Sequence, residues 1–341
     1  MKIDPGTIYF VRETDRETGK LSDLVKIGLV NGSKSPWDRL KDHQTGNPRK
    51  LVFDDAQFIE TSAVGYVEWL IHKTFAAERV SGEWFLLPTK QDVDKVVRKA
   101  NEIASEVSSK IPLIEGAERL TSEVSESSAI DSTEDIRAKA WELAILQKQS
   151  SMIVTLKKST SKCFGKVVEE FGTEALAEQV KFTPVNPQSK FNPGILESKY
   201  PKLYENYLRT EEELVGLKLE LEKTAKESDL PDDFTNLKTK IKERNELALS
   251  SRNYYLLNEN LVFLDEFKSS IDWPLKVLDA ELKVFCGRAE GVLGLYKWHR
   301  RYEAGKPFVA ESELIRDHNL EYLDCFDAKK PSLRKKAIPQ K

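Results

Sequence analysis

The chain has 341 residues, of which 40% are hydrophobic and 32% are charged, and its formal net charge at pH 7 is −3. This length and hydrophobic content exclude global disorder and predict more than one hydrophobic core. The near balance of charge excludes a strongly basic protein, so any binding of nucleic acid must rest on local patches. No hydrophobic stretch reaches the length of a membrane span, and the three cysteines form no metal or redox motif, so we expect a cytoplasmic protein.

The first segment of the chain predicts a small antiparallel sheet. Residues 7–11 and 24–29 are short, β-branched and hydrophobic, which indicates two strands. The polar stretch from Arg12 to Asp23 between them indicates a hairpin with a long loop. Residues 50–59 indicate a third strand, and we therefore expect a three-stranded antiparallel sheet.

Helices are expected on either side of the third strand. Ser35 is a suitable N-cap and Asp38 stands where the acid of a capping box belongs, which predicts a helix that stops near Gly46. Residues 62–77 carry hydrophobic side chains at helical spacing. Thr89 repeats the capping signal before a further helix. The fold class is therefore α+β, with a sheet flanked by helices.

The chain divides into three parts by composition. Residues 1–110 form the α+β domain, and residues 111–134 are rich in Ser and Glu, which indicates a mobile linker. Residues 135–341 are dominated by helical patterns. Within them, residues 208–249 are rich in charge and predict a charged helical hairpin, which could be a coiled coil.

An internal duplication is also predicted in the helical region, with copies at about residues 135–210 and 257–328. Residues 156–172 align without gaps to residues 278–294, and the identities are sparse, so chance is the alternative. This alignment matches Gly165 with Gly287 and Gly172 with Gly294. Downstream of it, the candidate pairs are Phe182 with Trp298, Phe191 with Phe308, and Tyr204 with Tyr322.

The first domain carries a set of polar residues that suits phosphodiester hydrolysis. Tyr9 and Lys26 lie on the two strands of the hairpin, and Arg39 and His43 share one face of a helix. Glu68 lies on the next helix. Hydrolysis requires a base, a positive charge on the non-bridging oxygens and help for the leaving oxygen. A single carboxylate can hold Mg²⁺, which keeps most of its waters.

The order of these residues resembles the signature of the GIY-YIG nuclease superfamily, over about residues 6–97 only. The resemblance is to a branch that is frequent in phages and bacteria and has lysine in place of the second tyrosine. The residues that carry it are Thr7-Ile8-Tyr9, Lys26-Ile27-Gly28, Arg39-Leu40, His43, Gln44-Thr45-Gly46-Asn47-Pro48, Glu68, His72, Phe75 and Gly82-Glu83-Trp84-Phe85. Thr7 replaces the first glycine of the signature, and its closing asparagine has no clear counterpart here.

The resemblance implies a role for each residue. Tyr9 would be the general base or would orient the attacking water, and Lys26 would lower the pKa of Tyr9 or contact the scissile phosphate. Arg39 would bind the nucleic acid and stabilise the charge that develops on phosphorus. His43 would bind phosphate or assist proton transfer. Glu68 would be the only protein ligand of the metal, Mg²⁺ or Mn²⁺.

Each residue also has an interpretation without catalysis. Tyr9 would be a core aromatic residue and Lys26 a solvated residue at a sheet edge. His72 is expected to be structural, and Glu83 and Trp84 are expected to be turn and packing residues. Gly28 would permit a close approach of the backbone at the site.

Two basic clusters near the end of the chain are candidates for contact with DNA. The first interleaves basic and aromatic residues, which suits backbone contact and base stacking, and comprises Lys297, Trp298, Arg300 and Arg301 around His299. The second is a basic terminus with Lys329, Lys330, Arg334, Lys335 and Lys336. The alternatives are a solvated helix end and a disordered tail.

The sequence thus predicts a metal-dependent DNA endonuclease whose helical region binds DNA or a protein partner, or self-associates. Defence against foreign DNA and the processing of mobile-element DNA are settings that fit. RNA fits as well as DNA, because the proposed groups contact phosphate. The alternative is a catalytically inactive nucleic-acid-binding or scaffold protein with a nuclease-like head.

Overall fold

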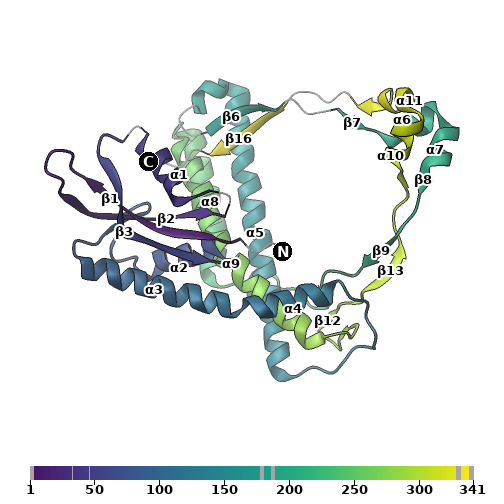
Figure 1. Ribbon diagram of the computed structural model, residues 1–341, viewed down its shortest axis with the longest axis horizontal. Coiled ribbons are helices and arrows are strands. Elements are labelled where there is room, and N and C mark those ends of the chain that lie inside the picture. Colours follow the sequence, from purple (N-terminus) through teal and green to yellow (C-terminus); the bar gives the residue numbers. More distant parts are fainter. Residues whose placement is uncertain are drawn as a thin grey trace.

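The computed structural model describes residues 4–32, 34–45, 47–176, 180–185, 189–327 and 332–337. It consists of an N-terminal α+β head, a mainly helical region, and a long two-stranded ribbon that forms an arch beside the helical region (Figure 1). The predicted fold class is thereby confirmed. Within the described part, no helix is both long and hydrophobic enough to span a membrane.

The head is built on a five-stranded antiparallel sheet. The three predicted strands are present as β1 (Gly6–Thr14), β2 (Leu21–Asn31) and β3 (Lys50–Thr61). Two short strands, β4 (Arg79–Ser81) and β5 (Trp84–Leu86), extend the sheet beyond β2, so that the order is β3-β1-β2-β5-β4. The hairpin strands are longer than predicted.

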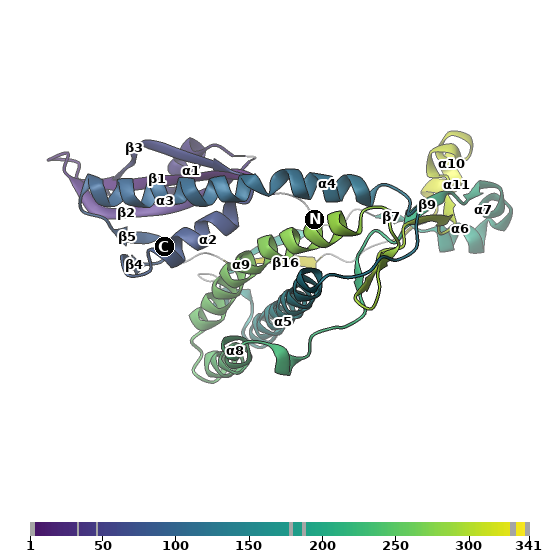
Figure 2. The same cartoon turned by 90° about the horizontal axis from the view of Figure 1, so that it is seen from below.

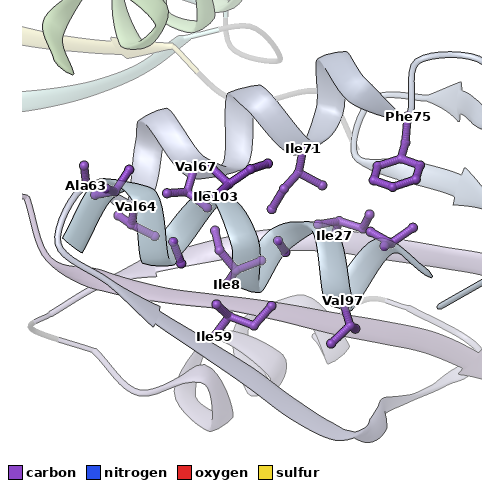
Figure 3. Close-up of a cluster of buried hydrophobic side chains, with 14 of the residues drawn as sticks. Ile8, Ile27, Ile59, Ala63, Val64, Val67, Ile71, Phe75, Val97 and Ile103 are labelled. Carbon is purple, nitrogen blue, oxygen red and sulfur yellow. The ribbon is translucent and has the colours of Figure 1, made fainter. Parts of the chain in front are cut away.

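Helices cover both faces of this sheet. Helices α2 (Val64–Thr74) and α3 (Lys90–Ser109) pack on one face, where Figure 3 shows isoleucines of three strands against both helices. Helix α1 (Pro36–Gln44) packs on the other face over a smaller cluster. The predicted capping boxes at Ser35 and Thr89 are both formed, which explains where α1 and α3 begin.

The expected mobile linker is wrong. Residues 111–121 form helix α4 (Ile111–Thr121), and its Ile114 and Ala117 belong to the core of the head. Beyond α4, Ser127 and Ile130 form β-bridges to Ala289 and Val292. Most of the serines and glutamates are exposed, and the half-buried Ser125 accepts a hydrogen bond from Arg300 N, so the segment is packed in spite of its composition.

The helical region has its own core. Helices α5 (Glu134–Phe171), α8 (Asp232–Ser250) and α9 (Tyr255–Cys286) bury the second hydrophobic cluster between them. Helix α9 also lies along the head in Figure 2. Its Trp273 and Ala280 are part of the head core, so the two regions are docked together.

The ribbon replaces most of the predicted helical hairpin at residues 208–249, of which only α8 is helical, apart from the short turn η2 (Glu227–Asp229). Chain segments on either side of α8 and α9 pair as antiparallel strands instead. The pairs are β6 (Val180–Val185) with β16 (Ser332–Ala337), β7 (Lys190–Phe191) with β15 (Phe326–Asp327), β8 (Leu208–Arg209) with β14 (Phe308–Val309), β9 (Glu212–Val215) with β13 (Arg301–Ala304), and β10 (Glu220–Leu221) with β12 (Tyr296–Lys297), which also pairs with β11 (Gly291–Val292). The turn η1 (Thr173–Leu176) follows α5.

Two similar helix pairs lie within the ribbon, between the β7–β15 pair and the β8–β14 pair. They are α6 (Pro193–Lys199) with α7 (Pro201–Tyr207), and α10 (Glu311–Asp317) with α11 (Asn319–Leu323). The backbone bonds are reciprocal, since Asn192 N donates to Cys325 O and Ala310 N donates to Tyr207 O. Tyr204 and Tyr322 occupy matching places in the two pairs, and the fully buried Leu196 and Leu314 do so as well.

This symmetry does not follow the gapless alignment predicted from the sequence. Gly165 lies inside α5, whereas its aligned partner Gly287 ends α9 with a φ of 59°. Phe191 matches Val309 and not Phe308, as the ladder shows. The duplication of residues 135–210 and 257–328 therefore stays a prediction. The predicted matches of Gly165 with Gly287 and of Phe191 with Phe308 are wrong.

The first basic cluster is not a DNA-stacking surface. Trp298 and Arg300 are both 0% exposed, and the guanidinium of Arg300 lies 3.7 Å from the centre of the Trp298 ring. Arg300 donates to the carbonyls of Leu120 and Gly287, so it joins α4 to the end of α9. The predicted nucleic-acid role of Trp298 and Arg300 is therefore wrong.

The other basic candidates are placed differently. Lys297 is exposed, and the exposed Arg301 forms an ion pair with Glu303. For these two residues, contact with DNA stays a prediction. In the basic terminus, Lys329 and Lys330 lie outside the described residues. Arg334, Lys335 and Lys336 belong to β16, whose side chains are not described.

We expect Arg300→Ala to lower the free energy of unfolding by about 3 kcal/mol, because it removes a buried cation that satisfies two buried carbonyls. Urea unfolding measures this change, and Arg301→Ala, which alters an exposed arginine, is the matched control. An unchanged unfolding midpoint with weaker DNA binding would restore the DNA-contact interpretation.

Candidate active site

Strand register places Tyr9 across the backbone of Gly28. The two residues are directly paired between β1 and β2, and Tyr9 is 1% exposed. A Cβ added at Gly28 would lie 2.5 Å from the Tyr9 hydroxyl and 2.6 Å from the ring carbon that carries it. Only glycine leaves room for the phenol, so the close approach predicted at Gly28 is made by the side chain of Tyr9.

Helix α1 brings Arg39 and His43 to this phenol. Leu40, between them, packs against the small cluster that contains Tyr9, and this contact anchors the helix on the sheet. The Nε2 atom of His43 lies 3.1 Å from the Tyr9 hydroxyl. Arg39 is half-buried and lies close enough to lower the pKa of Tyr9.

Helix α2 brings Glu68 to the open edge of β2. Strand β5 pairs with β2 only as far as Lys26, and beyond it the carbonyl of Ile27 lies 3.1 Å from Nε2 of His72. His72 is therefore structural, as expected. Glu68 lies one helical turn before His72, and its Oε1 atom is buried with no hydrogen-bond partner among the described residues.

Lys26 and Glu83 form an ion pair beside these residues. The Glu83 backbone carbonyl accepts a hydrogen bond of 2.9 Å from Ile27 N, which holds the Glu83 side chain next to Lys26. The sequence interpretation treated Glu83 as a turn residue and missed this ion pair. The signal available was its place in the Gly82-Glu83-Trp84-Phe85 string, which runs into β5, the strand whose Trp84 pairs with Lys26.

Burial shifts the pKa values of these groups in a consistent way. Burial raises the pKa of Tyr9, and the charge of Glu83 adds to that, while Arg39 opposes it. Since the pKa of Tyr9 is raised overall, a lowering by Lys26, or its contact with the scissile phosphate, stays a prediction. Burial, with help from Lys26 and Arg39, lowers the pKa of His43 to about 4. At neutral pH the phenol is therefore protonated and the imidazole is neutral.

Burial and the negative charge of Glu83 together raise the pKa of Glu68 to about 8, against the opposing charge of Lys26. Burial alone would raise the pKa of Glu83 too, but the Lys26 ammonium outweighs it and that pKa is lowered. Two carboxyl groups thus lie near one another in different protonation states, which is frequent at active sites.

The site fits a single divalent cation held by one carboxylate. No group of three or more metal-binding side chains occurs in the described part of the chain. The buried Glu68 Oε1 without a partner, close to the charge of Glu83, is the kind of oxygen that a hard cation would satisfy. Mg²⁺ would then keep most of its water ligands.

Comparison with known proteins agrees with this head. Residues 6–101 match the family model of the T5orf172 domain. The match supports a nuclease-like or DNA-binding domain and begins and ends close to the boundaries of the sheet and its helices. No curated protein and no solved structure matches the chain.

We expect Gly28→Ala to destabilise the protein by about 1–3 kcal/mol, because the new methyl group overlaps the Tyr9 phenol. Thermal unfolding measures the loss. Gly116→Ala in α4 is the control, because an added Cβ there meets only Val284 at an ordinary 3.8 Å. If the Gly28→Ala protein were as stable as wild type and its Tyr9 ring had not moved, the placement of the Tyr9 ring against Gly28 would be contradicted.

In EDTA, we expect the free energy of unfolding to fall as the pH rises from about 6.5 to about 8. The window begins at about 6.5 because, at lower pH, the buried His43 and His72, whose pKa values are lowered to about 4, add the opposite dependence. In this window the folded protein holds the Glu68 proton and the unfolded chain has lost it, so the raised pKa destabilises the folded state by at most about 1.4 kcal/mol per pH unit.

Urea unfolding at several pH values checks this dependence. Glu68→Gln should flatten it, whereas Glu106→Gln, at an exposed glutamate of α3, should leave it unchanged. The same slope in the wild type and in Glu68→Gln would show that Glu68 does not titrate in this range.

Proposed function

We propose that the head is a metal-dependent endonuclease that hydrolyses DNA phosphodiester bonds by attack of water. The observation that carries this proposal is the convergence of Tyr9, Arg39, His43 and Glu68, which come from one strand and two helices, near Gly28 of the neighbouring strand. The match of residues 6–101 to the T5orf172 domain supports it. RNA stays a second possible substrate, because the groups that converge contact phosphate and read neither base nor sugar.

The Tyr9 and His43 pair would move the proton of the attacking water. A neutral imidazole can accept at Nε2 the proton that the Tyr9 hydroxyl donates over 3.1 Å. As the phenol passes that proton to His43, its oxygen can accept the proton of the water. The raised pKa of Tyr9 does not prevent this role, because the phenol does not have to lose its proton to solvent.

Arg39 would stabilise the charge that develops on the phosphoryl oxygens. Its guanidinium can donate two parallel hydrogen bonds to a phosphate, and its half-buried position beside Tyr9 strengthens them. Lys26 is held by Glu83, so a direct phosphate contact by Lys26 would require that ion pair to open.

Glu68 would hold the cation, Mg²⁺ or Mn²⁺. The bound cation would supply Lewis-acid stabilisation of phosphate oxygens and of the leaving oxygen. A cation is also the natural partner for the Glu68 carboxylate, whose charged form is otherwise disfavoured by burial and by Glu83.

A second candidate is a head that binds nucleic acid without cutting it. The pKa of about 8 for Glu68 favours it, because a neutral carboxylic acid is a poor metal ligand. The helical region would then be the working part, through DNA, a protein partner or a second copy. Roles in defence against foreign DNA or in mobile-element processing stay predictions under either candidate.

We expect purified protein to nick or cut plasmid DNA with Mg²⁺ or Mn²⁺ and not with EDTA. Glu68→Gln and Arg39→Ala should each slow cleavage by at least about 100-fold, because each removes a charge that acts on the transition state. Gel analysis of plasmid and linear substrates measures the rates.

Lys41→Ala is the control for Arg39→Ala, because Lys41 is exposed on the same helix outside the converging set. Circular dichroism establishes that each variant is folded. Metal-independent cleavage, or equal rates in wild type and both variants, would show a contaminating nuclease. No cleavage of DNA or RNA by folded wild type would favour the second candidate.

A further inference from the structure

A lysine-lined groove lies on α5, outside the site described above. It has a volume of about 840 Å³, and its charged residues are Lys157, Lys158, Lys162, Lys166 and Lys268, with Glu169 as the one acid among its lining residues. A chain with a net charge of −3 thus gathers five ammonium groups in one place. Such a local excess of one sign attracts an oppositely charged partner.

Helix geometry puts the lysines in a row. Lys158, Lys162 and Lys166 are four residues apart, so they lie on one face of α5 and rise by about 6 Å at each step. Leu156 and Phe164 are buried on the opposite face, which keeps the row turned outwards. All three lysines are exposed.

These three ammonium groups are available to a ligand. Lys157 forms an ion pair with Asp265, and Lys268 forms one with Asp272. Lys158, Lys162 and Lys166 form no ion pair with any described residue. A row of separate, uncompensated charges suits a polyanion with regularly spaced charges better than one small anion.

The rest of the groove suits backbone contact. Between the lysines it is lined by Val154, Ser161 and Gly165, which are small and offer one hydroxyl. No aromatic side chain lines the groove, so bases have no stacking surface. Contact with a sugar–phosphate backbone needs only the ammonium groups and a close approach.

Helix α9 lies between the groove and the head, because it lines the groove with Lys268 and contacts the head through other residues. Lys268 on α9 is followed by Ser269, whose Oγ would be 3.5 Å from a Cβ added at Gly65 on α2. Glu266, one half-turn earlier, pairs with Arg79 of the head at 3.4 Å. Helix α2 also carries Glu68, so a long ligand in the groove can extend towards the head.

We propose that this groove binds the phosphate backbone of DNA outside the segment that is cut. The proposal rests on the proposed nuclease function for its biological use, but binding itself requires neither metal nor cleavage. It gives the helical region a definite part in holding the substrate, in place of the buried Trp298 and Arg300.

The test is the affinity of the full chain for a short fluorescein-labelled DNA duplex in EDTA, by fluorescence anisotropy at several salt concentrations. The combined Lys158→Gln, Lys162→Gln and Lys166→Gln variant should bind at least about tenfold more weakly. The slope of log affinity against log salt should fall by about 3, because three phosphate contacts are lost.

The control is the variant Lys238→Gln, Lys240→Gln and Lys242→Gln, which removes the same charge from exposed positions of α8. It should bind as wild type does. Equal affinity and slope in the α5 variant and wild type would overturn the proposal, as would equal losses in both variants or no binding by wild type. A wild type that binds anionic vesicles and not DNA would also overturn it.

The outcome is separable from that of the proposed function. Loss of cleavage in Glu68→Gln with unchanged binding in EDTA supports the catalytic role and leaves the groove intact. Binding that depends on the α5 lysines in a protein that cuts nothing would retain the groove and overturn the nuclease.

Discussion

Helix α9 is the element on which the arrangement of the whole chain depends, because it presents two hydrophobic faces. Trp273 and Ala280 on one face complete the core of the head, while Leu264, Ile271 and Leu282 on another complete the core of the helical region. Burial of both faces removes hydrophobic surface that neither region could cover alone. The head is therefore held on α9, which also packs against α5.

Within the head, the decisive constraint is the pairing of Tyr9 with Gly28. It places a phenol in a buried position, and the burial then determines the chemistry of its neighbours. The same low-polarity surroundings keep His43 neutral and Glu68 protonated without a cation, since each charged form would lose its hydration. Under the proposed function, these surroundings, together with the charge of Glu83, would separate the proton acceptor His43 from the metal ligand Glu68.

Local signals were sufficient to predict most of the head. Capping boxes, β-branched runs and turn residues act over a few residues, so the starts of α1 and α3 and the first three strands could be derived from the sequence. The convergence of Tyr9, Arg39, His43 and Glu68 was predicted from the order of the sequence motifs along the chain, because that order is characteristic of a complete fold. The Lys26 and Glu83 pair could not be derived, because it depends on how β5 meets β2 across a long stretch of chain.

The ribbon shows why the remainder resisted prediction. Leu217, Leu219 and Leu221 alternate as in a strand, but the many charged residues around them indicate a solvated helix. The sequence alone does not show that a partner strand exists. That partner lies beyond α8 and α9, and Gly216 approaches it so closely that an added Cβ would be 1.9 Å from the His299 carbonyl oxygen. The same pairing draws Trp298 and Arg300 inward. The basic and aromatic segment around Trp298 and Arg300 would suit contact with DNA if it were an exposed helix. It is buried instead, because non-local strand pairing determines which side chains are exposed to solvent.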